Sequence, residues 1–312
     1  MRTHSSRAYL CVSIDTECDK GKGWLSRKPL AFEGIHDGVM KRLQPLFAAH
    51  GAKPTYLLSP EVLRDDASVT ALRTIADSCE LGTHLHGEYA EPDAFEPDVT
   101  TAIQRDYPPE IERQKLTYLT DLFIRAFDHQ PLSFRAGRFG IGSESIGILE
   151  SLGYHVESSV TPHMTWREVG SGFSFVDAPS QPYRPDPIDP GRPGDAKILE
   201  VPVTIRRRFI NALPGIGKRV DPSWLRPTKG TTQRLVRVAE DEIAESRRRA
   251  PGRPVILNAM FHNVEICKGT SPYAATEEEA DGILGRLRGL LEFARRESIA
   301  VVGLADVPEI LA

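Results

Sequence analysis

Hydrophobic and polar positions along the chain change their periodicity repeatedly, which predicts strands and helices in alternation. Apolar runs with the length and composition of buried strands lie at 9–14, 54–58, 79–86, 132–135, 154–157, 197–201, 254–260 and 299–302. Segments with apolar residues at helical spacing lie at 34–50, 67–78, 110–127, 144–152, 231–249 and 277–296. Strands that alternate with helices are typical of an α/β protein with a mainly parallel sheet or barrel.

Two stretches with the composition of loops interrupt this alternation. Residues 87–109 are polar and contain several prolines, and residues 180–195 contain proline at short, regular intervals. A segment rich in arginine and lysine follows at 205–230. Since no internal repeat or clean linker divides the 312 residues, we predict a single domain over residues 1–312.

Side chains that bind metals follow two of the predicted strands in pairs. Asp15 and Glu17 are separated by one residue, and so are His84 and His86. In an extended strand, residues i and i+2 point to the same face, so each pair presents two ligands together. Imidazole nitrogens and carboxylate oxygens are ligands of zinc-like ions, and catalytic zinc sites use three of them. The pattern indicates a mononuclear metal hydrolase, although a His-x-His pair at a strand end also occurs without a metal.

Two further residues with catalytic chemistry are predicted at the same end of the sheet. Arg135 ends one predicted strand, and His262 follows another. The carboxyl ends of parallel strands meet at one face of a barrel, where enzymes of this kind assemble their sites. We therefore expect Arg135 and His262 to lie near Asp15 and His84.

Composition and charge narrow the classes of function. The chain is 40% hydrophobic and 26% charged with a mean hydropathy of -0.30, as in an ordinary globular protein. A net charge of -4 argues against general binding to nucleic acid or to anionic membranes. No apolar run reaches the length of a transmembrane segment, and the N-terminus lacks the apolar core of a signal peptide, so we expect a cytoplasmic location. The scattered cysteines are consistent with free thiols.

Five stretches of the chain resemble the motifs of the polysaccharide deacetylase family, carbohydrate esterase family four. In the family's order they are 13–17 (SIDTE), 82–86 (GTHLH), 134–140 (FRAGRFG), 157–159 (ESS) and 257–262 (LNAMFH). The stretch at 157–159 is the weakest of the matches. The resemblance covers most of the chain and implies a distorted (β/α)7-type barrel.

The resemblance also implies a reaction and a set of roles. The activity would be metal-dependent hydrolysis of an N-acetyl group on an amino sugar, with one divalent ion, zinc being expected and cobalt or nickel being alternatives. Asp15 would be the catalytic base, and Glu17 and His84 would bind the metal. His262 is the candidate acid that protonates the departing amine, because histidine can do this near neutral pH. Arg135 would pair with Asp15 and keep its pKa low.

The chain departs from the family at two points. The family's two acidic residues are adjacent, whereas Asp15 and Glu17 are separated by Thr16. The family's two histidines are spaced more widely, so the position of the second one holds Glu88 in this chain. Strand alternation favours His86 as the third metal ligand, with Glu88 as the alternative.

Other residues are candidates for contact with the substrate. Arg138, Phe139 and Trp166 are candidate contacts for the sugar, and the basic segment 205–230 is either a solvated face or a contact for a phosphate. The expected substrate is an amino-sugar-containing small molecule or glycoconjugate precursor. A deformylase of a lipid-linked amino sugar, an allantoinase-like amidohydrolase and a degenerate protein that binds sugar without catalysis stay open as alternatives.

Overall fold

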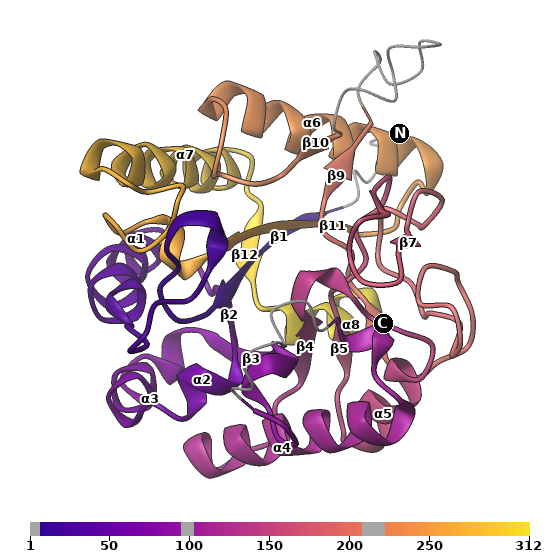
Figure 1. Cartoon of the computed structure of the whole chain (residues 1–312). Coiled ribbons are helices and arrows are strands. Elements are labelled where there is room, and N and C mark those ends of the chain that lie inside the picture. Colours follow the sequence, from indigo (N-terminus) through magenta and orange to yellow (C-terminus); the bar gives the residue numbers. More distant parts are fainter. Residues whose placement is uncertain (1–6, 95–102, 208–221) are drawn as a thin grey trace.

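The strands of the computed structural model form one curled, parallel sheet with helices around its outside (Figure 1). The structure describes residues 7–94, 103–207 and 222–312. The strands of this sheet are β1 (Ala8–Thr16), β2 (Thr55–Leu58), β3 (Glu80–Leu85), β4 (Ser133–Ala136), β5 (Val156–Glu157), β8 (Leu199–Glu200), β11 (Val255–His262) and β12 (Ala300–Val302). Their order is β11-β1-β2-β3-β4-β5-β8, with β12 paired to β1.

The barrel is distorted because β8 and β11, at the two ends of this order, do not pair as strands. The segment just beyond β8 nevertheless contacts β11, because the N–H of Thr204 donates to the carbonyl of Asn258 at 3.0 Å. The predicted α/β fold with a distorted (β/α)7-type barrel is confirmed.

The covering helices lie close to where the apolar periodicity predicts them. They are η2 (Gly34–Leu43), α1 (Gln44–Ala49), α2 (Pro60–Leu63), α3 (Asp66–Arg73), α4 (Pro109–Phe127), α5 (Ser145–Ser151), α6 (Thr232–Arg249), α7 (Glu277–Arg296) and α8 (Val307–Leu311). The predicted helix 34–50 is one continuous segment whose first part, η2, is wound as a π-helix. The short helices α2 and α8 escaped prediction because a single turn carries too little periodicity to be recognised.

The start of helix α7 and the face that it buries both follow from its local sequence. The Thr276 hydroxyl accepts from the N–H of Glu279 at 3.2 Å, and the Glu279 carboxylate accepts from the N–H of Thr276 at 3.0 Å. This capping box satisfies two N–H groups that have no partner inside the helix. Apolar residues at helical spacing, Ile283, Leu287 and Leu290, then face the core and are buried.

The register of the parallel strands brings distant segments of the chain together. Along β1, Asp15 lies beside His262 of β11 on one side and Leu57 of β2 on the other. In the next strand pair, His84 of β3 lies beside Arg135 of β4. Chemistry-bearing residues from four strands therefore reach the same edge of the sheet.

The remaining parts of the chain include two small antiparallel hairpins. One pairs β6 (Thr165–Trp166) with β7 (Phe173–Ser174), and the other pairs β9 (Ile205–Arg206) with β10 (Ser223–Trp224). Residues 180–195 contain no helix and no extended strand, as their composition predicts. The central part of the basic segment 205–230, residues 208–221, and part of the loop 87–109, residues 95–102, lie outside the described residues.

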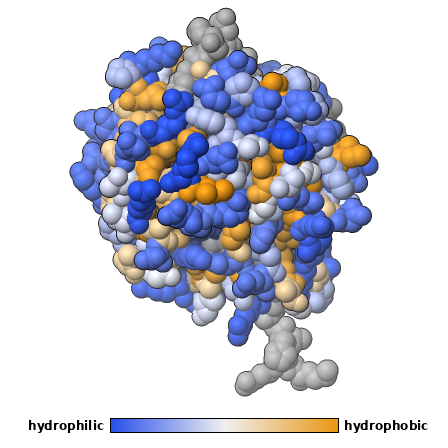
Figure 2. Space-filling model, turned by 90° about the horizontal axis from the view of Figure 1, so that it is seen from below, coloured by the Kyte–Doolittle hydropathy of each residue, from blue (hydrophilic) through white to orange (hydrophobic). Residues whose placement is uncertain are grey.

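The surface has the mixed character of an ordinary globular protein. Figure 2 shows one face on which hydrophilic residues surround small, separate hydrophobic patches. No helix in the described ranges is long and apolar enough to cross a membrane, and the cytoplasmic location stays a prediction. The four cysteines, Cys11, Cys18, Cys79 and Cys267, are free thiols.

Candidate active site

A cavity of about 500 Å³ opens at the carboxyl ends of the strands. Its floor is formed by Asp15 and Glu17 at the end of β1, His84 and His86 at the end of β3, and His262 at the end of β11. The structure thus brings together residues that are up to 247 positions apart, because parallel strands end at one edge of the sheet.

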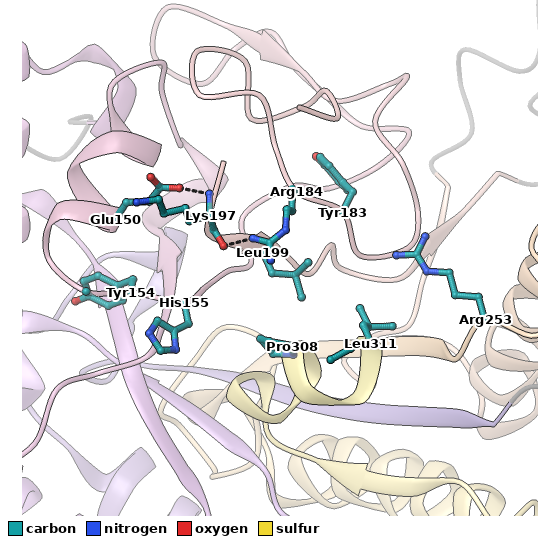
Figure 3. Close-up of a pocket in the computed structure, with 12 residues that line it drawn as sticks. Glu150, Tyr154, His155, Tyr183, Arg184, Lys197, Leu199, Arg253, Pro308 and Leu311 are labelled. Carbon is teal, nitrogen blue, oxygen red and sulfur yellow. Dashed lines mark hydrogen bonds between the residues drawn. The ribbon is translucent and has the colours of Figure 1, made fainter. Parts of the chain in front are cut away.

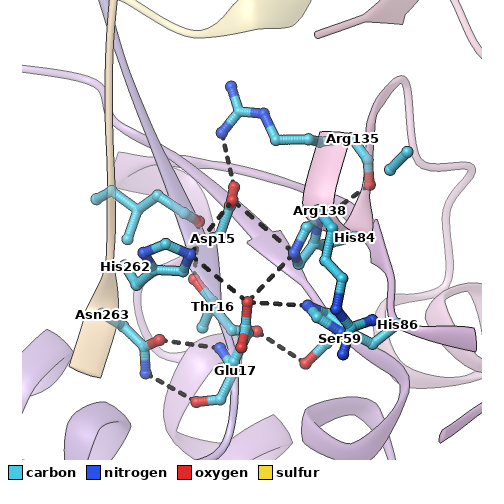
Figure 4. A network of polar contacts seen from close by, with 12 residues as sticks. Asp15, Thr16, Glu17, Ser59, His84, His86, Arg135, Arg138, His262 and Asn263 are labelled. Atoms are coloured by element: carbon cyan, nitrogen blue, oxygen red, sulfur yellow. Dashed lines mark hydrogen bonds and ion pairs between the residues drawn. The ribbon is translucent and has the colours of Figure 1, made fainter. Parts of the chain in front are cut away.

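Three donor atoms converge at the centre of this floor. Oε1 of Glu17 lies 3.3 Å from Nε2 of His84 and 3.1 Å from Nε2 of His86. All three side chains are buried, and their ligand atoms lie within 4.8 Å of one another. Figure 4 shows both imidazoles pointing at the Glu17 carboxylate from the side of β3.

Groups behind the two histidines fix the orientation of their rings. Nδ1 of His84 lies 3.0 Å from the backbone carbonyl of Arg135, and Nδ1 of His86 lies 3.1 Å from the Glu88 carboxylate. With a metal ion bound, a proton on each Nδ1 would donate to these acceptors and leave the lone pair of each Nε2 free for the ion. Glu88 therefore lies behind His86, where it also accepts from Arg138 at 2.8 Å.

The donor set fits a catalytic zinc-like site. Two neutral imidazoles and one carboxylate are a known set of protein ligands for such an ion, which keeps a further position open. Oε2 of Glu17 is turned away and lies 2.9 Å from the ammonium of Lys20, so only Oε1 faces the histidines. This is the only cluster of this kind among the described residues.

Lys20 is a buried residue of the site that the sequence analysis did not identify. Burial opposes the charged form of Glu17, but Lys20 and His86 outweigh it and hold the pKa of this carboxyl well below its usual value. In turn, burial opposes the charged form of Lys20, and Glu17 outweighs it and raises the pKa of the ammonium. The i, i+3 spacing from Glu17 is the only sequence signal for this contact.

Asp15 is held by a guanidinium that has no exposed surface. Nη1 of Arg135 donates to Oδ1 of Asp15 at 2.6 Å, while its other nitrogens donate to Ser13 and Ser158. Burial opposes ionisation of Asp15, but Arg135 and His84 outweigh it and lower the pKa of the carboxyl. Oδ2 of Asp15 is left facing the site, 3.8 Å from Nε2 of both His84 and His262.

His262 faces Asp15 and Glu17 from the opposite side to His84 (Figure 4). Its Nδ1 lies 2.7 Å from Oε1 of Glu265, which is fully buried and paired with Arg226. Burial opposes ionisation of Glu265, but Arg226 and His262 outweigh it and lower the pKa of the carboxyl to about 2. The sequence analysis assigned no role to Glu265 or Arg226, and only the three-residue spacing from His262 hints at the first.

Aromatic side chains form the walls of the cavity. Phe139 and Trp166 stack with ring centroids 5.5 Å apart, and Trp24 packs edge-on against His262 at 4.8 Å. Phe139 and Trp166 therefore line the cavity, and their contact with a sugar stays a prediction. Arg138 also lines the cavity, with its guanidinium held by Glu88.

Solved structures with the same fold give a context for this arrangement. A protein from Parabacteroides distasonis, described as a glycoside hydrolase/deacetylase, superposes with a TM-score of 0.68 at 13% identity, over 99% of this chain and 72% of that chain. One from Mycobacterium smegmatis, assigned as a polysaccharide deacetylase, gives 0.54 at 15% identity over 100% and 92%. The chain has the polysaccharide deacetylase fold.

The same fold also carries other chemistry. The allantoinase Puue superposes with a TM-score of 0.59 at 11% identity, over 98% of this chain and 91% of that chain. Neither a family model nor a curated protein matches the sequence. Because a fold does not fix a reaction, the activity must be argued from the site itself.

A larger cavity, of about 640 Å³, lies away from this site beside α8 (Figure 3). It borders the amino ends of β5 and β8, the opposite end of those strands from the one that carries the site residues in β1, β3 and β11. Two of its charged side chains bond to the backbone: Glu150 accepts from the N–H of Ile198 at 3.0 Å, and Arg184 donates to the carbonyl of Ala196 at 3.2 Å. These contacts describe a structural crevice with no group of metal ligands in its lining.

Proposed function

We propose that the protein is a metal-dependent hydrolase that removes the N-acetyl group from an amino sugar or sugar precursor. The observation that carries this proposal is the convergence of Glu17, His84 and His86 beside an ionised Asp15 and a carboxylate-linked His262. The shared fold with assigned deacetylases supports it.

Glu17, His84 and His86 would hold one divalent ion, with zinc expected and cobalt or nickel as alternatives. When bound, such an ion polarises the amide carbonyl and makes a water molecule more acidic. The chain's own contribution is to keep Glu17 ionised through Lys20 and to aim both imidazoles through Arg135 and Glu88.

Asp15 is the proposed general base. Its Oδ1 is occupied by Arg135, and its Oδ2 faces the site, where it can take a proton from the attacking water. Arg135 does not contact the cavity itself and acts by holding Asp15 ionised and in place.

His262 is the proposed general acid. The Glu265 carboxylate accepts a hydrogen bond from Nδ1–H and stabilises the imidazolium, so Nε2 can deliver a proton to the departing nitrogen. Phe139 and Trp166 would pack against the apolar face of the sugar ring, and Arg138 lies at the edge of the same cavity.

The proposal is tested by measuring metal content and acetate release together. Wild-type protein should hold about one divalent ion per chain and release acetate from N-acetylated amino sugars. The His84→Ala variant should lose the metal and the activity. Wild-type protein that takes up no zinc, cobalt or nickel would exclude this mechanism and leave sugar binding without catalysis.

An allantoinase-like activity is the second candidate, because the allantoinase Puue shares the fold over nearly the whole chain. Assaying the same metal-loaded protein with allantoin separates the two candidates. Release of formate from an N-formylated amino sugar, without release of acetate from the N-acetylated sugar, would instead select the deformylase.

A further inference from the structure

A second cavity, of about 420 Å³, lies beside the candidate active site. It is lined by Arg226, Lys229 and Arg234 and contains no Asp or Glu in its lining. Arg226 is shared by the two regions, because its Nη2 lies 3.3 Å from Nδ1 of His262. We call this the basic cavity.

Aromatic rings form the partition between the basic cavity and the active site. Tyr273 on the basic side packs against Trp24 on the active-site side with ring centroids 5.3 Å apart. Trp224 on the basic side lies 5.8 Å from Phe139 in the same way. At both points, one ring from each cavity therefore packs directly against a ring of the other.

The cations of the basic cavity differ in whether a carboxylate of the protein neutralises them. Arg226 is paired with the buried Glu265. Lys229 lies over the ring of Tyr273 at 5.2 Å, and Arg234 donates to the hydroxyl of Ser223 at 3.2 Å. Within the described ranges neither Lys229 nor Arg234 has an acidic partner, so both charges are available to an anion.

The backbone around the cavity is held in place and adds to its positive potential. Arg286 donates to the carbonyls of Pro227 and Thr228, which fixes the segment that presents Lys229. Helix α6 begins at the edge of the cavity, at Thr232, two residues after Gly230, so the positive end of its dipole lies there too.

The basic segment of the sequence thus divides into two parts with different roles. Arg206 is paired with the buried Glu242 at 2.9 Å and is not part of the lining. The expectation of a phosphate contact therefore moves to Arg226 and Lys229, at the end of the segment, and to Arg234 in helix α6. Several cations around one cavity match a multiply charged anion better than a single carboxylate.

We propose that the basic cavity binds a phosphate or diphosphate of the substrate, so that the substrate is an amino sugar phosphorylated on its anomeric oxygen. In a 2-acetamido sugar the anomeric carbon is the neighbour of the carbon that carries the acetamido group, and Arg226, which lines the basic cavity and contacts His262, is the point where the two regions meet. This inference rests on the proposed deacetylase function, and the two can fail separately.

The affinity for inorganic pyrophosphate, measured by titration calorimetry, tests the cavity without any catalysis. The double variant Lys229→Gln/Arg234→Gln should weaken binding about tenfold or more, because two charge-assisted contacts are lost. Arg237→Gln is the matched control, since Arg237 lies on the same helix but pairs with Asp241 outside the cavity. Equal affinities in wild type and the double variant would overturn the proposal.

Two further arms identify the source of the anion and separate the two proposals. If glucuronate binds as tightly as pyrophosphate, the cavity recognises a carboxylate as well as a phosphate, and its assignment as a phosphate site is overturned. In the activity assay, the double variant should raise KM for an N-acetylated sugar 1-phosphate and leave KM for the methyl glycoside unchanged. The protein could also bind pyrophosphate through Lys229 and Arg234 and yet show no deacetylase activity. That result would overturn the proposed function and support the anion site. If the protein deacetylates both substrates and the double variant shifts KM equally for the sugar 1-phosphate and the methyl glycoside, the proposed function stands and the phosphate site is overturned.

Discussion

Two pairs of carboxyl groups are buried in this barrel, and they have opposite character. Asp15 and Glu17 lie at the end of β1, whereas Glu157 and Glu200 lie opposite each other on β5 and β8. The pKa values of the first pair are lowered. The pKa of Glu200 is raised well above its usual value, because burial and the neighbouring Glu157 both oppose its ionisation.

Burial is nearly complete for both pairs, so burial alone does not decide their charge. The first pair is surrounded by cationic and imidazole groups, including Arg135 and Lys20. Within the described residues no cation makes an ion pair with Glu157 or Glu200, and an oxygen of each lacks a hydrogen-bond partner outside the pair. The surroundings thus favour the ionised forms of Asp15 and Glu17 and the protonated form of Glu200.

The largest expected effect is on turnover when the ionised pair loses its base. Asp15→Asn keeps the shape of the side chain and its contact with Arg135 but cannot accept a proton. We expect kcat to fall by about 10²- to 10⁴-fold with the metal content unchanged. Glu157→Gln, at a buried carboxyl outside the lining of the cavity, is the control and should leave kcat near the wild-type value. A mild loss in Asp15→Asn would assign the base elsewhere.

Removing the cation from the ionised pair should cost stability. Arg135→Gln leaves Asp15 buried without its partner, so the free energy of unfolding should fall by about 3–5 kcal/mol, measured by chemical denaturation. The control is Arg192→Gln, which breaks an exposed ion pair with Asp189 and should change this free energy by less than about 1 kcal/mol. Similar losses in both variants would show that Arg135 contributes no more than a surface pair.

The group behind His86 should affect metal affinity less than the histidine itself. Glu88→Gln is expected to weaken metal binding by about 10- to 100-fold, because the ring of His86 loses the carboxylate that orients it. His86→Ala should abolish binding at the same metal concentration. The reverse order, measured by competition with a chelator, would make Glu88 the third ligand.

The smallest effect is expected at Glu200 and depends on pH. Glu200 has a folded-state pKa above its unfolded value of 4.5, so the folded state binds a proton that the unfolded state releases. Its contribution to stability is present below that unfolded value and is lost as the pH rises through the folded value. Glu200→Gln stays neutral and should unfold at a higher temperature than wild type at about pH 8 but not at about pH 4. Parallel pH profiles would show that Glu200 is already ionised.

The regular elements of the fold were predictable because their signals are local. The buried strand β1 and the long helices α6 and α7 were recognised from runs and helical periodicity that each segment carries by itself. The pairs Asp15/Glu17 and His84/His86 were likewise visible, since spacing by two residues at a strand end places two side chains on one face.

The contacts that define the site were set by the tertiary structure. Glu17 meets His86 across 69 positions, and Asp15 meets Arg135 across 120, so strand register decides which atoms face each other. The tertiary structure also places Glu88 behind His86, against its Nδ1. These contacts depend on neighbours that are remote in the chain, which no local pattern records.

What the sequence by itself determined is therefore the alternation of strands and helices and the residue types that end β1, β3 and β11. Only the tertiary structure decided their electrostatic state, by placing Arg135 and Lys20 against one pair of carboxyl groups and leaving Glu157 and Glu200 to face each other. The physical reason is that the charge of a buried group depends on what surrounds it in space, and a chain specifies that only once it has folded.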